Sequence, residues 1–262
     1  DLVPVVKADA YGHGQNTVAL ALLSEGAQAF ASGSIGESAD LRIALNSADV
    51  SASRPQILSL LGFLDKEEIR IAAAYAIPPA VHSFRQLDLL AKANVPLSIA
   101  IKCNSGMSRL GFDDKDVPGV IAALKRVRRV RPSLAVSHLA SADSEEGILE
   151  VRRQAQKFAR MTSQLRREWP ELALSLANSA GALLGEEVEE LLGRHSMRPG
   201  LSLYGGNPME GTSMSRLGEE LLPAMSVSAP IIAVRELSPG EAIGYGHTFR
   251  ATRRTPVGIV AV

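Results

Sequence analysis

The stretch Val5-Val6-Lys7-Ala8-Asp9-Ala10-Tyr11-Gly12-His13-Gly14 is the most informative part of this chain. A short apolar strand, predicted from Leu2 to Val6, ends directly in a lysine. A lysine at the end of a buried strand is costly unless its amine is paired, or is neutral and chemically used, for example as a Schiff base with a carbonyl cofactor. Tyr11 is close enough in sequence to reach a phosphate, and the two glycines allow close backbone approach. For the lysine alone, an amine that extends into solvent is the competing interpretation.

Outward from this stretch, short apolar strands alternate with amphipathic segments along most of the chain. Such alternation predicts right-handed βαβ units and a parallel sheet. Eight units within residues 1–204 match the size of a (β/α)8 TIM barrel, the α/β fold that we predict. An open doubly wound sheet is the competitor, but no predicted strand is followed by G-x-G-x-x-G. The predicted strands are Leu2–Val6, Ala27–Ser32, Gln56–Leu60, Ile77–His82, Leu97–Lys102, Leu134–Leu139, Leu172–Ala177 and Leu201–Tyr204. The predicted helices include Gln15–Glu25, Glu37–Asn46, Phe84–Ala93, Asp116–Val130 and Ile148–Trp169.

The pattern changes near residue 208. We predict a cofactor-binding barrel over residues 1–208, and the start of a mostly β C-terminal domain over residues 209–262. Two segments of this domain have the composition of strands, Ala224–Glu236 and Val257–Val262, and a Pro-Gly turn follows the first segment. No later segment follows to complete that sheet, and the chain does not begin with Met. We therefore expect it to be an internal part of a longer protein.

The composition is that of an ordinary globular protein. The chain has 262 residues, of which 46% are hydrophobic and 21% charged, and its formal net charge is zero. This balance gives no reason to expect a nucleic-acid or membrane partner. No apolar run reaches the roughly 18 residues of a membrane span, and the single cysteine excludes an internal disulfide. We expect a cytoplasmic protein, and we expect no metal site.

The residues that carry chemistry gather where the predicted strands end, which in a barrel is the face where active sites form. Lys102 begins Lys-Cys-Asn-Ser-Gly-Met-Ser-Arg109-Leu-Gly, and His138 lies at the end of a predicted strand. Asn178-Ser179 begins a helix after the seventh strand, and Arg198-Pro-Gly-Leu201 precedes the eighth. Taken alone, each is also explained as a helix cap, turn or structural group.

Together these strings resemble the alanine racemases, the pyridoxal-phosphate enzymes that interconvert L- and D-alanine. The first stretch resembles V-V-K-A-N/D-A-Y-G-H-G, and the Lys102 string resembles K-x-D/N-T/S-G-M-x-R-L-G. The later strings resemble S-x-x-N-S-A, R-P-G-L/I-x-L-Y-G and, at Gly244-Tyr245-Gly246, V/I-G-Y-G. The resemblance covers almost the whole chain, although such enzymes begin earlier and continue beyond Val262.

The resemblance implies a role for each of these residues. Lys7 would hold pyridoxal 5′-phosphate and act as one catalytic base, and Tyr245 of the partner subunit in a homodimer would act as the other. Arg109 would contact substrate. Lys102 would be either the lysine that this family often carbamylates or an ordinary salt-bridged lysine. The remaining cofactor-binding residues would be Tyr11, His138, Asn178, Ser179, Arg198, Gly200 and Leu201.

The implied function is a two-base alanine racemase that supplies D-alanine for cell-wall peptidoglycan. A racemase of serine or of broader specificity is the main alternative. A barrel-type amino-acid decarboxylase would need a carboxylate where Arg198 stands. A non-catalytic cofactor-binding barrel would lack residues 212–262 and the second base.

Overall fold

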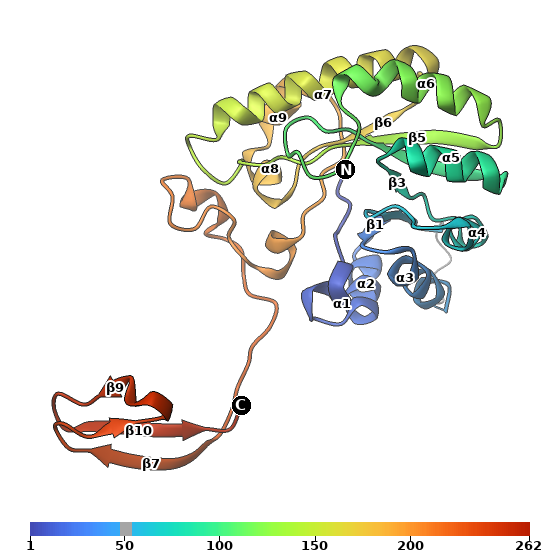
Figure 1. The fold of residues 1–262 in the computed structure, drawn as a ribbon. Helices are drawn as coiled ribbons and strands as arrows, with labels where there is room; N and C mark the ends of the chain where they lie inside the picture. Colours follow the sequence, from blue (N-terminus) through green and yellow to red (C-terminus); the bar gives the residue numbers. More distant parts are fainter. Residues whose placement is uncertain (48–53) are drawn as a thin grey trace. The chain divides into compact units, whose positions relative to one another are not determined.

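The computed structural model describes residues 1–47 and 54–262. These residues form two compact units, Asp1–Pro223 and Ala224–Val262. The first unit contains an inner layer of strands and an outer layer of helices (Figure 1). The predicted domain boundary after residue 208 stays a prediction. In the structure, residues 209–223 group with the first unit.

Parallel strands form the inner layer of the first unit. β1 (Ala29–Ser32) pairs with β2 (Gln56–Ser59). β3 (Ala80–Val81), β4 (Leu97–Lys102), β5 (Val130–Val136) and β6 (Ala173–Ser175) form a four-stranded parallel sheet in that order.

Isolated parallel bridges join these two sheets into a closed ring. Ser59 bridges to Pro79, which connects β2 with the segment that leads into β3. Ser175 of β6 bridges to Ser196, whose segment bridges through Met197 to Leu2. Val5 then bridges to Ala31 of β1. The segment at Leu2–Val6 and the segment at Ser196–Arg198 are thus the first and last of eight parallel segments, and the predicted (β/α)8 barrel is confirmed.

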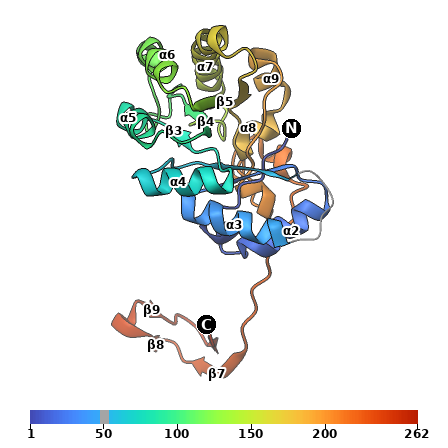
Figure 2. The ribbon, with the colours of Figure 1, turned by 90° about the vertical axis from the view of Figure 1, so that its right-hand side faces the viewer.

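Helices cover the outside of the barrel (Figure 2). They are α2 (Gln15–Ser24), α3 (Ile35–Ser47), α4 (Lys66–Tyr75), α5 (Phe84–Ala93), α6 (Val117–Arg126), α7 (Ile148–Glu168), α8 (Ser179–Leu184) and α9 (Glu186–Leu192). α7 buries Val151, Ala155, Phe158 and Leu165, which recur at the spacing of one helix face. The predicted helix Asp116–Val130 is too long, because α6 ends at Arg126 and β5 already begins at Val130.

The alternation of side chains along the strands creates two cores. Phe30, Ile57 and Ile99 belong to the large core that the helices cover. A smaller cluster takes one residue from each of six neighbouring strands, and therefore fills the barrel axis. Its members are Val5, Ala31, Leu58, Ala80, Ala100 and Val136.

The predicted eighth strand, Leu201–Tyr204, is wrong. These residues form a 3-10 helix, η2, and the last barrel segment lies before them, at Ser196–Arg198. The backbone turns at Gly200, whose carbonyl accepts a hydrogen bond from the Leu203 N–H at 3.0 Å. The Tyr204 hydroxyl then donates to the Val5 carbonyl at 2.9 Å, which holds η2 against the first strand.

The second unit is built of short antiparallel strands. β7 (Ile231–Leu237) pairs with β10 (Thr255–Val260), and β8 (Ala242–Ile243) pairs with β9 (Phe249–Arg250). The predicted strand Ala224–Glu236 therefore starts later than expected. In the part of the chain that is described, no helix has the length and apolar character to cross a membrane.

Candidate active site

The chain after the first barrel strand forms a left-handed turn. In α1 (Lys7–Tyr11), Ala8, Asp9, Ala10 and Tyr11 all have φ between 51° and 55°. A left-handed backbone costs about 1–2 kcal/mol for each residue with a Cβ, so this run forms only where other contacts hold it. The turn places Lys7 and Tyr11, the two residues that the sequence assigns to opposite ends of a cofactor, on one short segment.

Hydrogen bonds from outside the turn stabilise this unusual backbone. The Gln15 N–H at the start of α2 donates to Asp9 Oδ1 at 2.7 Å, and the Ala8 N–H donates to Glu37 Oε1 at 3.1 Å. Within the turn, the Ala10 N–H donates to the Val6 carbonyl at 3.0 Å. The conformation of the Lys7 segment therefore depends on α2 and α3.

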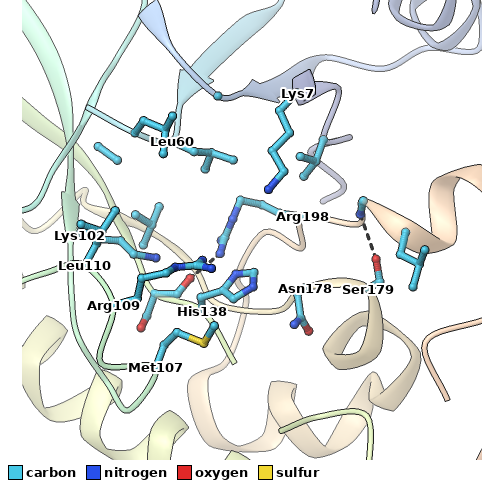
Figure 3. Close-up of a pocket in the computed structure, with 18 of the residues that line it drawn as sticks. Lys7, Leu60, Lys102, Met107, Arg109, Leu110, His138, Asn178, Ser179 and Arg198 are labelled. Atoms are coloured by element: carbon cyan, nitrogen blue, oxygen red, sulfur yellow. Dashed lines mark hydrogen bonds between the residues drawn. The ribbon is translucent and has the colours of Figure 1, made fainter. Parts of the chain in front are cut away.

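The carboxyl ends of the barrel strands surround a cavity of about 730 Å³. It brings together nearly all of the residues that the sequence singles out, and Figure 3 shows several of them. The predicted residues that line it are Lys7, Tyr11, Lys102, Arg109, His138, Asn178, Ser179, Arg198, Gly200 and Leu201.

One end of the cavity is a polar cradle. Ser179 Oγ accepts hydrogen bonds from the Gly200 N–H at 3.0 Å and from the Ser202 N–H at 3.2 Å. A Cβ on residue 200 would collide with the Tyr11 hydroxyl, so a glycine there lets the Tyr11 ring approach the turn closely. The Asn178 side chain caps α8 by accepting from the Gly181 N–H at 3.0 Å. Hydroxyl groups and backbone N–H groups are the donors that bind phosphate.

Arg198 lies at the centre of the site and is almost completely buried. Its guanidinium donates to the Ser175 hydroxyl, to the Ser137 carbonyl and, at 3.4 Å, to the Leu176 carbonyl. Burial lowers the pKa of Arg198 to about 10, so it remains charged at neutral pH. In Figure 3 the Lys7 side chain points toward this guanidinium.

The positive charges shift the pKa values of their neighbours. Burial, with the charges of Arg198, Lys102, Arg109 and Lys7, lowers the pKa of His138 to about 3, so its imidazole is neutral. Burial and the charges of Arg198 and Arg109 lower the pKa of the Lys102 amine to about 7. A large share of Lys102 is therefore uncharged and nucleophilic at neutral pH.

The cavity carries an excess of positive charge, which indicates an anionic ligand. Glu37 is already occupied by backbone N–H groups, since it accepts from Ala8, Gly33 and Ser34. The lining contains four basic side chains and two carboxylates, namely Lys7, Lys102, Arg109 and Arg198 against Glu37 and Asp143. The donor set and the charge therefore fit a molecule with a phosphate and an aldehyde, together with a substrate carboxylate. Among the described residues, no group of three or more His, Cys, Asp or Glu side chains could hold a metal.

Asn104 organises the loop that carries Arg109. Its Oδ1 accepts from the Ser108 N–H at 2.9 Å, and its Nδ2 donates to Asp113 Oδ1 at 2.9 Å. As an amide, Asn104 can make both bonds, whereas an aspartate would repel Asp113. The loop is therefore held without adding negative charge beside Arg109.

Tyr245 is the one predicted site residue that does not line this cavity. It lies in the second unit, between Gly244 and Gly246, and its side chain is fully exposed. Both glycines have positive φ, 82° and 72° respectively, so the turn presents the tyrosine at its tip.

Glu37 is a site residue that the sequence analysis did not identify. A signal for it is present in Ser34-Ile-Gly-Glu37, which has the S-x-x-E spacing of a helix capping box. The Glu37 N–H donates to Ser34 Oγ at 3.1 Å, and the Ser34 N–H donates to Glu37 Oε2 at 3.3 Å. The sequence spacing predicts this pair, but it does not predict the bond to Ala8.

Comparisons with known proteins agree with this architecture. Residues 1–208 match the family described as "Alanine racemase, N-terminal domain", and residues 224–262 match "Alanine racemase, C-terminal domain". The alanine racemase of Nitratidesulfovibrio vulgaris (strain DP4) is 42% identical over 262 residues, covering 99% of this chain and 67% of that protein. The alanine racemase of Lawsonia intracellularis is 36% identical, with 99% and 67% covered.

Solved structures give the same result. The biosynthetic alanine racemase of Pseudomonas aeruginosa superimposes with a TM-score of 0.79 at 32% identity, covering 99% of this chain and 68% of that one. The Bartonella henselae alanine racemase, whose structure has covalently bound pyridoxal phosphate, gives a TM-score of 0.79 at 27% identity, with 100% and 68% covered. The chain thus spans about two thirds of the length of these relatives. It belongs to the alanine racemase family of amino-acid isomerases.

Proposed function

We propose that this chain interconverts L-alanine and D-alanine with pyridoxal 5′-phosphate bound at Lys7. The observation that carries the proposal is the barrel cavity in which the Lys7 side chain points toward a buried arginine, Arg198, and the Ser179–Gly200 cradle lies at one end. When bound, pyridoxal phosphate withdraws electrons from the substrate Cα, which makes its proton easier to remove.

Different residues of the cavity would bind the phosphate and the aldehyde of this cofactor. The phosphate would be held by Ser179, Gly200, Leu201 and Tyr11. Asn178 caps the helix that carries Ser179. Lys7, which lines the same cavity, would hold the aldehyde carbon. The short left-handed turn between Lys7 and Tyr11 sets the spacing of these two contacts.

Arg198 would face the pyridine nitrogen of the bound cofactor and would determine the type of reaction. It is charged at neutral pH and has no acceptor, so it donates to that nitrogen and leaves it without a proton of its own. Held in this way by Arg198, the cofactor would stabilise negative charge at Cα less strongly, and return of a proton to Cα would be favoured over transamination. His138, held neutral, supplies hydrogen bonds at this end.

Arg109 binds the substrate carboxylate, and Lys102 lies beside it. With a pKa near 7, the Lys102 amine can attack carbon dioxide, forming an N–C bond and releasing a proton. The resulting carbamate is an anion that holds the Arg109 guanidinium and offsets the excess positive charge. An unmodified Lys102 would leave that excess in place.

Two bases act on opposite faces of Cα. Lys7 removes the proton on one face, and the partner subunit's Tyr245 serves the other, so the active form is a homodimer. The exposed position of Tyr245 at the tip of a Gly-Tyr-Gly turn supports this arrangement. A free tyrosine has a pKa of about 10, so Tyr245 needs the positive charges of the cavity to act as a base.

The similarity to the biosynthetic enzyme of P. aeruginosa supports a role in supplying D-alanine for cell-wall peptidoglycan. The single, buried cysteine is compatible with a reducing cytoplasm. Growth of bacteria that require D-alanine, after expression of the protein, tests this role directly.

The central experiment replaces Lys7 with alanine. The unaltered protein should show the visible absorption band of lysine-bound cofactor and should racemise alanine in both directions. The variant should lose the band on dialysis and lose both activities. Lys92→Ala, an exposed lysine in the last turn of α5, is the matched control and should keep both. A borohydride-reducible adduct in Lys7→Ala would contradict the assignment.

A further inference from the structure

Glu37 uses both oxygens of its carboxylate, each for a different purpose. Oε2 accepts from the Gly33 N–H at 2.9 Å and from the Ser34 N–H at 3.3 Å, which caps the start of α3. Capping of this kind requires one oxygen only. Glu68 at the start of α4 makes the same contact with one oxygen, since its Oε2 accepts from the Leu64 N–H at 2.6 Å.

The second oxygen of Glu37 reaches across to the first barrel strand. Oε1 accepts from the Ala8 N–H at 3.1 Å, a contact between residues 29 positions apart. Ala8 directly follows Lys7 and is the first residue of the left-handed turn. The first N–H group of a helical turn has no partner within it, so Glu37 satisfies the donor that the turn itself leaves free.

Lys7 and Glu37 approach each other closely around Gly33. A Cβ on residue 33 would lie 2.5 Å from Glu37 Oε2 and 3.6 Å from the Cβ of Lys7. The Gln15 side chain supports the same region by donating to Ser32 Oγ and to the Glu37 carbonyl, both at 3.2 Å. A side chain at position 33 would therefore displace the Glu37 carboxylate from its present hydrogen bonds.

We infer that Glu37 is a positioning residue for Lys7, which holds the peptide unit after the lysine and so directs its amine toward one face of the substrate Cα. The inference rests on the proposed racemase function. A shift of about 1 Å in a reacting group can reduce its rate about 10²-fold. Loss of the Ala8–Glu37 bond should therefore weaken proton transfer on the Lys7 face and leave the Tyr245 face unchanged.

The test compares exchange of the Cα hydrogen in D₂O for the two enantiomers of alanine, measured on the whole protein loaded with pyridoxal phosphate. The family resemblance assigns D-alanine to Lys7 and L-alanine to Tyr245. Glu37→Ala should lower exchange from D-alanine by about 10²-fold, and exchange from L-alanine should match that of Glu68→Ala. Glu68→Ala removes an equivalent capping carboxylate, which accepts from the Leu64 N–H and not from the segment after Lys7, and should affect both enantiomers alike.

Two further variants distinguish loss of positioning from loss of the folded structure. Glu37→Gln keeps the size of the side chain, but its NH₂ group must face one of the backbone N–H donors. Gly33→Ala keeps the carboxylate and forces it to move. Both should show the same selective loss from D-alanine, with urea midpoints close to that of the unaltered protein.

The outcomes separate this inference from the proposed function. If the unaltered protein exchanges hydrogen from neither enantiomer, the proposed racemase function fails. If the unaltered protein exchanges both, and the Glu37 and Gly33 variants lose both equally, Glu37 is only a helix cap and the positioning role is overturned.

Discussion

Replacement of Lys102 by methionine should make the cofactor-free protein more stable at neutral pH. Methionine has a similar length and no charge, so it removes the cost of burying the amine and the repulsion from Arg198 and Arg109, while it keeps the packing. The gap between the ordinary pKa of 10.5 and the value of about 7 in the folded protein corresponds to about 5 kcal/mol, at about 1.4 kcal/mol for each pH unit. Relaxation and water penetration reduce such penalties, so we expect a gain of about 2–3 kcal/mol at pH 7.

The sign of the pH dependence follows from the depressed pKa. Between pH 7 and 10.5 the unfolded chain holds a proton on Lys102 that the folded chain has released. The free energy of unfolding of the unaltered protein should therefore rise through this range, and Lys102→Met should lack that contribution to the rise. The two curves should converge above pH 10.5, where Lys102 is neutral in both states.

Urea denaturation of the cofactor-free proteins across this pH range, in buffer free of carbon dioxide, measures both effects. Lys125→Met is the matched control, because Lys125 is exposed and forms a surface ion pair with Glu168 at 2.6 Å. It should change stability by less than about 1 kcal/mol and leave the pH slope intact. Added bicarbonate should stabilise the unaltered protein near pH 8 and leave Lys102→Met unaffected, because only the former can form a carbamate. A less stable Lys102→Met, or a curve parallel to that of the unaltered protein, would refute the reasoning.

Two further predictions concern the reaction. Arg198→Glu should lengthen the life of the negative charge at Cα, seen as a new absorption band at longer wavelength, with more transamination and slower racemisation; normal turnover without that band would mean that Arg198 does not face the ring. Tyr245→Phe should lower racemisation by about 10²- to 10⁴-fold, and exchange in D₂O should persist from D-alanine and nearly vanish from L-alanine. Mixed dimers of Lys7→Ala and Tyr245→Phe subunits should recover activity at one site, and no recovery would exclude action of Tyr245 across the interface.

Elements with strong local signals were predicted closely. The helix Phe84–Ala93 and the strand Leu97–Lys102 have the predicted bounds. Ser83 caps that helix by accepting from the Gln86 N–H, and Asn94 ends it in the left-handed conformation. Both residues act on their immediate neighbours, so the signal is contained in a few consecutive positions.

Elements that depend on distant contacts were not predicted. The apolar run Leu201–Tyr204 has a strand-like composition, but the turn at Gly200 and the bond from Tyr204 to Val5 make it a 3-10 helix. The left-handed turn after Lys7 ends at Gly12, but the four residues before that glycine carry a Cβ and are left-handed too, which their own types do not predict. It persists because α2 and α3 supply the bonds from Gln15 and Glu37.

The family, the barrel and the list of chemical groups could all be inferred from the amino-acid sequence, because strand and helix periodicity and the motif strings are properties of consecutive residues. How those groups affect one another depends on the folded barrel. Lys102, His138 and Arg198 are far apart in the chain, and their pKa values shift because the closed barrel buries them side by side. The same closure brings Glu37 to the backbone beside Lys7, since desolvation, charge repulsion and hydrogen bonding act through distance in space and not along the chain.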